Sequence, residues 1–145
     1  MSNPHVLPLP PALQRLIDSG FWPRNQQESQ AQHSKPLITK AKVQAFAPDE
    51  DGIHLYPFPF YTVSECGQYG EEWWDEWTAV HMIDPARTLI IADFGIGSDT
   101  LIALDYRRDI NNPTVIRLKW QGQGDDNIWI RVAPSFDAFM HLLFD

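Results

Sequence analysis

The clearest alternation of apolar and polar positions lies in the second half of the chain, where four short apolar runs predict β-strands. These runs are Thr88–Ala92, Leu101–Tyr106, Val115–Trp120 and Ile128–Val132. The segments between them contain glycine, asparagine, aspartate and proline, which are typical of turns. Because strands joined by short connections usually pair with one another, we expect an antiparallel meander. Residues 101–104 are apolar on both faces, which is typical of a central strand.

An N-terminal helix is predicted over residues 9–20, where Leu13, Leu16 and Ile17 share one face. Pro11 suits the first turn of this helix, because the N–H that proline lacks is not needed there. Gly20 suits its end, where the backbone often adopts a left-handed conformation.

A C-terminal helix is predicted after Ser135, a good N-cap residue, with Asp137 in the favourable first turn. Apolar residues then recur with helical spacing and form a stripe that should dock on the sheet. The stripe consists of Phe136, Phe139, Met140 and Leu143.

The middle of the chain has weaker patterns. Residues 24–36 are rich in glutamine, serine and asparagine and predict an exposed, mobile connection. Val43–Phe46 predicts a short strand, and Ile53–Tyr56 predicts its hairpin partner. The Tyr56–Tyr61 segment contains two prolines, so we expect an extended edge or surface segment whose aromatic side chains cover the core.

An unusual stretch of acidic residues and tryptophans follows and predicts a middle helix, because acidic residues favour helix N-termini. Its members are Glu71, Glu72, Trp73, Trp74, Asp75, Glu76 and Trp77. Tryptophan is a frequent anchor at protein interfaces, so we take these residues as candidates for partner binding. The alternative is that the tryptophans cover the core, and the two roles are compatible because tryptophan is rarely buried completely.

The 145 residues fit a single domain spanning 1–145, long enough to bury a real core. The expected class is α+β, with a mostly antiparallel sheet of four to six strands and N-terminal, middle and C-terminal helices packed on it. The single cysteine, Cys66, excludes an intrachain disulfide and fits a reducing compartment. The first residues do not resemble a signal peptide, so we expect a cytoplasmic protein with no membrane association.

The net charge of −8 is unevenly distributed, because no lysine or arginine occurs between Lys42 and Arg87. Such an acidic interval repels nucleic acid and would attract a basic partner. The alternative is a solvated acidic face that only aids solubility.

Motifs for catalysis or cofactor binding are weak. Gly95 and Gly97 lack the third glycine and following helix of a dinucleotide site. The histidines lack the i, i+4 spacing of a metal-binding helix. Asp93, Asp99 and Asp105 are expected to cap turns or to contact a nearby arginine. We therefore expect no catalytic residue, metal or cofactor, with a small hydrolase using Cys66 or the carboxylates as the less favoured alternative.

Residues 91–107, IADFGIGSDTLIALDYR, resemble the central strand–turn–strand of the SUKH superfamily, also called the Smi/Knr type. The similarity continues through Pro113–Trp120 and Trp129–Phe136 into the last helix, and Leu9–Pro11 resembles the N-terminal opening of the family. The resemblance covers the last third to half of the chain.

The resemblance implies an α+β fold with helices packed on one sheet. It also implies a protein-binding role without catalytic residues, such as an immunity protein that binds and neutralises a cognate bacterial toxin. The acidic interval fits a basic toxin, for example a nuclease. The alternative within this fold is a regulatory adaptor with a housekeeping partner.

Overall fold

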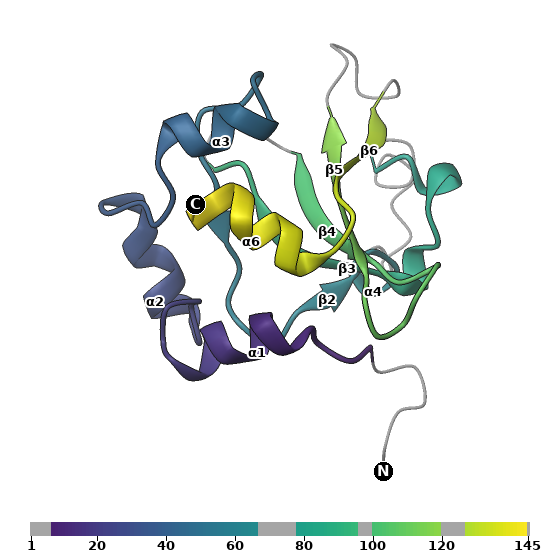
Figure 1. Ribbon diagram of the computed structural model, residues 1–145, viewed down its shortest axis with the longest axis horizontal. Coiled ribbons are helices and arrows are strands. Elements are labelled where there is room, and N and C mark those ends of the chain that lie inside the picture. Colours follow the sequence, from purple (N-terminus) through teal and green to yellow (C-terminus); the bar gives the residue numbers. More distant parts are fainter. Residues whose placement is uncertain (1–6, 67–77, 96–99, 120–126, 145) are drawn as a thin grey trace.

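A computed structural model describes residues 7–66, 78–95, 100–119 and 127–144 (Figure 1). The strands of its sheet are β1 (His54–Leu55), β2 (Tyr61–Thr62), β3 (Thr88–Asp93), β4 (Leu101–Asp105), β5 (Thr114–Lys119) and β6 (Ile128–Ala133). The α-helices are α1 (Pro11–Asp18), α2 (Gln26–Gln30), α3 (Lys40–Phe46), α4 (Val63–Cys66) and α6 (Phe136–Phe144). Short 3₁₀-helices are η1 (Ala31–His33), η2 (Val80–Met82) and η3 (Pro85–Arg87).

Within the described residues the sheet has six strands, all paired antiparallel, and the order of its main path is β1-β3-β4-β5-β6. Strand β2 also pairs with β3, on the same edge as β1. Strands β3 to β6 form the predicted meander, and β4 is central with all five residues buried. The α+β class and the antiparallel sheet are therefore confirmed.

Apolar residues cover both faces of this sheet. On one face of the sheet, α6 packs with α1 and α3, and Figure 1 shows α6 in yellow beside the strands. Phe139 of α6 is completely buried, and its ring lies 5.6 Å from that of Phe46. On the other face, Val63, Ile83 and Trp129 are among the residues that form a smaller cluster. The alternation along β3 and β4 therefore supplies two separate cores.

The two terminal helices are confirmed, although α1 is shorter at both ends than the predicted 9–20. Pro11 occupies the first turn of α1, and Gly20 follows the helix with φ of +82°. At the start of α6, the Ser135 hydroxyl accepts a hydrogen bond from the Ala138 N–H at 3.1 Å. The predicted middle helix over residues 71–77 lies outside the described residues, while α2, α3 and α4 supply helices elsewhere in the middle of the chain.

The strand predicted at Val43–Phe46 is wrong, because these residues end the helix α3. The Thr39 hydroxyl caps this helix by accepting a hydrogen bond from the Lys42 N–H, and Val43 is the residue it buries. Residues 53–56 consequently do not form the predicted hairpin, and β1 pairs with β3 instead. A capped helical turn with a buried valine outweighs the β-propensity of one short apolar run.

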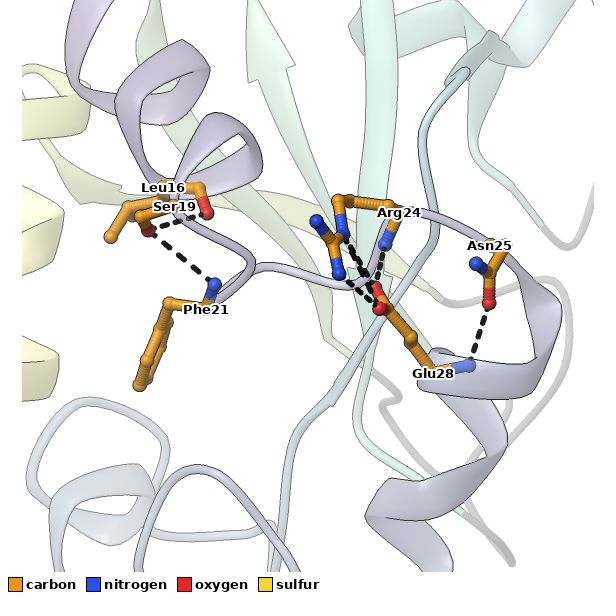
Figure 2. A network of polar contacts seen from close by, with 6 residues as sticks. All are labelled: Leu16, Ser19, Phe21, Arg24, Asn25 and Glu28. Atoms are coloured by element: carbon orange, nitrogen blue, oxygen red, sulfur yellow. Dashed lines mark hydrogen bonds and ion pairs between the residues drawn. The ribbon is translucent and has the colours of Figure 1, made fainter.

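The connection predicted for residues 24–36 contains α2 and η1, and most of its residues are exposed as expected. Figure 2 shows the start of α2, where the Asn25 side chain accepts from the Glu28 N–H and Arg24 pairs with Glu28 at 2.7 Å. The hydrogen bonds from Arg24 lower the pKa of Glu28 from 4.5 to about 2. Local capping and an ion pair thus organise a segment of polar composition.

Candidate functional site

The edge of the sheet beside β3 is interrupted by a four-residue loop, residues 57–60, which we call the excursion. His54 and Leu55 pair with Asp93 and Ala92, and the Tyr56 N–H still bonds to the Ile91 carbonyl. The next partner of β3, at Ile90, is Tyr61. Residues 57–60 therefore leave the ladder between two adjacent positions of β3. Pro57 and Pro59 lack the N–H groups that a continuous edge strand would use.

Contacts from the segment after α1 hold this excursion in place. The Trp22 indole N–H donates to the Tyr56 carbonyl at 2.8 Å, and the Phe58 N–H donates to the Pro23 carbonyl. The Trp22 ring is fully buried and meets Phe60 edge to face, with 6.2 Å between centroids. The excursion is thus fixed to the core through its backbone and through Phe60.

Aromatic side chains of the excursion and of Tyr61, the residue that follows it in β2, remain in solvent. Phe58 is 45% exposed and Tyr61 is 57% exposed, so the prediction that the aromatics of this segment cover the core holds for Phe60 but not for these two. We call residues 57–61 the aromatic ridge. Because large aromatic side chains are normally covered in a monomer, the ridge is a candidate interface.

Two hollows lie against the ridge and share Pro59 and Phe60 in their walls. The first, which we call the Asp93 pocket, has a volume of about 290 Å³ and is lined by side chains that include Ser29, His54, Tyr56 and Cys66. The second, which we call the Leu89 hollow, has a volume of about 650 Å³. Its lining includes Leu9, Phe58, Glu65 and Leu89.

Asp93 is the polar centre of the first pocket. Its carboxylate accepts a hydrogen bond from the Gly95 N–H and another from the Tyr56 hydroxyl, each at 2.8 Å. Burial, the negative charge of Asp93 and this hydrogen bond raise the pKa of Tyr56. Tyr56 therefore keeps its proton at neutral pH and acts as a donor that orients the carboxylate.

A serine and a histidine meet at the same pocket, but their hydrogen bonds do not favour nucleophilic catalysis. The Ser29 hydroxyl donates to the Leu55 carbonyl at 2.9 Å, and its oxygen lies 3.0 Å from His54 Nε2. With the hydroxyl proton directed at Leu55, Nε2 has to donate to the serine oxygen. A general base would instead have to accept that proton.

The thiol of Cys66 also lacks the environment of an activated nucleophile. Burial and the nearby charge of Glu65 raise the pKa of this thiol. A raised pKa reduces the thiolate fraction, whereas reactive cysteines have lowered pKa values. The contacts around Cys66 therefore oppose thiolate formation.

The carboxylates considered from the sequence are separated. Asp93 pairs with Leu101 at one end of the β3–β4 hairpin, and Asp105 pairs with Thr88 at the other. Asp105 binds Arg107 at 2.9 Å, and Asp93 caps the turn at Gly95, as expected. Asp99 lies outside the described residues. Within the described ranges, no group of three or more potential ligands is placed to hold a metal ion.

The residues predicted from the sequence to bind a partner lie outside the part of the chain that the structure describes. They are Glu71, Glu72, Trp73, Trp74, Asp75, Glu76 and Trp77. The aromatic ridge was not predicted as a binding site, although aromatic residues alternating with prolines at a sheet edge are a signal for it. Asp93 was considered only as a turn cap or metal ligand.

Comparisons with protein-family models, with curated proteins and with solved structures find no match to this chain. Among the described helices, none has both the length and the apolar character needed to cross a membrane.

Proposed function

We propose that this chain is a non-catalytic protein-binding domain, an immunity protein of the SUKH type that binds and neutralises a cognate bacterial toxin. The observation that carries the binding role is the aromatic ridge, with Phe58 and Tyr61 in solvent between two hollows. Aromatic side chains beside recesses are typical anchors of a protein interface. The ridge is fixed to the core, so a partner would meet a surface that is already ordered.

The SUKH type is proposed from the sequence resemblance, and the fold is compatible with it. The resembling segments fall on consecutive elements, namely β3, β4, β5, β6 and α6. These elements form one antiparallel meander with a helix packed on it. This is the kind of α+β unit that the resemblance implies.

The charge of the region favours a basic partner, such as a nuclease toxin. The ridge lies inside the interval from Lys42 to Arg87 that contains no lysine or arginine between its ends. An acidic surface speeds association with a basic protein and repels acidic ones. We propose that Glu71, Glu72, Asp75 and Glu76 add to this field, with the three neighbouring tryptophans as further anchors.

The proposal is tested by capturing partners from the native host with the tagged chain and identifying them by mass spectrometry. We expect a stable basic partner whose toxicity the chain suppresses when both are expressed together. Capture of a housekeeping protein without any toxic activity would contradict the immunity role and favour a regulatory adaptor.

Variants then locate the interface on the captured partner. Replacing both Phe58 and Tyr61 by alanine should weaken binding by about 2 kcal/mol or more, as expected for interface anchors. Ile110→Ala is the matched control, because Ile110 is 52% exposed and does not line either hollow. Equal affinity of the double variant and the control would remove the ridge from the interface.

Reversing the charges of Glu71, Glu72, Asp75 and Glu76 should slow association with the partner at low salt, and an unchanged association rate would remove that segment from the interface.

A further inference from the structure

We infer that the Asp93 pocket binds the guanidinium group of one arginine side chain from the partner. The inference rests on the proposed protein-binding function and specifies the chemistry that one part of the interface recognises. It follows from the charge of the pocket, the arrangement of its acceptor and the character of its walls.

The first observation is that, among the described residues, no lysine or arginine pairs with the carboxylate of Asp93. Glu28, Asp49 and Asp105 are each paired with an arginine, at 2.7, 2.7 and 2.9 Å respectively. Both donors to Asp93, the Gly95 N–H and the Tyr56 hydroxyl, are neutral. No lysine or arginine is found among the described residues that line the pocket. A half-buried carboxylate in this setting attracts a cation.

The second observation is that this carboxylate is held in position and still has free acceptor capacity. The Gly95 N–H binds one of its oxygens and the Tyr56 hydroxyl binds the other. An ionised carboxylate offers about four acceptor positions, so about two are not used by these donors. Asp93 also lies on β3 opposite His54 of β1, so its backbone belongs to the sheet. A preorganised acceptor loses little freedom when it binds a ligand.

The third observation concerns the walls and the size of the pocket. Tyr56, Phe60 and Tyr61 place three aromatic rings in its lining, with Pro57 and Pro59 beside them. A planar guanidinium stacks on such faces and donates to a carboxylate at the same time, which favours arginine over lysine. The volume of about 290 Å³ lies at the lower limit of drug-sized sites, so the pocket suits a single side chain.

The test uses three blocked tripeptides, acetyl-Gly-Arg-Gly-amide and its lysine and citrulline counterparts, added to the full chain labelled with nitrogen-15. Gly95 is the reporter, because its amide donates to the carboxylate that would receive the guanidinium. We expect a saturable shift of the Gly95 resonance with the arginine peptide, a weaker one with lysine and none with citrulline. Because citrulline has nearly the same shape without the charge, this comparison needs no variant of the protein.

Asp93→Asn should lower the affinity for the arginine peptide by about tenfold or more, since a charge-assisted hydrogen bond becomes a neutral one. Asp51→Asn is the control, because it removes the same charge at an exposed carboxylate outside the lining. Equal binding of the arginine and citrulline peptides, equal loss in the two variants, or no Gly95 shift would overturn the inference.

These outcomes are separate from those that test the proposed function. Specific binding of the arginine peptide without any protein partner would support the site and contradict the immunity role. Capture of a toxin by a chain whose Gly95 resonance does not shift with the arginine peptide would support the immunity role and contradict the site.

Discussion

The side-chain amide of Gln32 forms hydrogen bonds with both the N–H and the carbonyl of Leu55. The Leu55 N–H donates to Gln32 Oε1 at 2.9 Å, and Gln32 Nε2 donates to the Leu55 carbonyl at 2.8 Å. Both residues are buried. Leu55 lies in β1 at the edge of the sheet, so Gln32 satisfies the backbone groups that a further strand would have paired. These hydrogen bonds anchor the polar segment 24–36 to the edge of the sheet.

Gln32→Ala should destabilise the fold by about 1–3 kcal/mol, because it leaves the buried Leu55 N–H without its acceptor. The Leu55 carbonyl keeps the Ser29 hydroxyl as a donor, which limits the loss. The free energy of unfolding in urea measures the effect. Gln30→Ala is the matched control, because Gln30 is exposed at the end of α2. A Gln32 variant as stable as the Gln30 variant would show that the edge is not closed in this way.

Asp49→Ala should destabilise the fold more than Gln32→Ala, because it leaves the guanidinium of Arg117 without its carboxylate partner. Arg117 is 2% exposed, binds Asp49 at 2.7 Å and lies 5.6 Å from the centre of the Phe94 ring. Loss of one partner from a buried ion pair costs about 3–5 kcal/mol, and we expect the lower end because Asp49 itself reaches solvent. Urea unfolding of this variant is compared with that of Asp51→Ala, whose carboxylate is exposed on the same loop.

Arg117→Met tests the same pair from the other side. It removes the buried charge and keeps an apolar chain of similar length, so it should cost less than Asp49→Ala. The reverse order of stabilities would contradict the assignment of the cost to an unpaired buried cation.

The ion pair of Arg24 and Glu28, shown in Figure 2, should make the free energy of unfolding depend on pH. The pKa of Glu28 is lowered from 4.5 to about 2. The contribution of the ion pair to the stability of the fold is therefore complete above pH 4.5 and is lost as the pH falls towards 2. The stability advantage of the wild type over Glu28→Gln should therefore shrink over this interval, as measured by urea unfolding at each pH. Arg24→Gln should return the pKa of Glu28 towards 4.5 in a carbon-13 titration. A wild-type midpoint already near 4.5 would contradict the pairing.

The limits of prediction from sequence follow from where the stabilising contacts lie. The β3–β6 meander pairs strands that are consecutive in the chain, and α1 and α6 are short amphipathic segments with local start signals, so spacing alone predicts them. The burial of Gln32 depends on Leu55, which is distant in the chain, and composition contains no sign of this contact. The Asp93 pocket likewise joins Tyr56 to Asp93 through the pairing of β1 with β3, a register that the wrong hairpin prediction did not contain.

Cys66 offers a direct test between the binding role and the hydrolase alternative. Since burial and the charge of Glu65 raise the pKa of its thiol, Cys66 should react with iodoacetamide more slowly in the folded chain than in urea at the same pH. Glu65→Gln should raise the rate in the folded chain, because it removes the charge that opposes the thiolate. The pH profile of alkylation should have its midpoint above the usual thiol range. A folded chain that reacts faster than the unfolded one would indicate an activated thiol, and the catalytic alternative would then replace the binding role as the better account of this pocket.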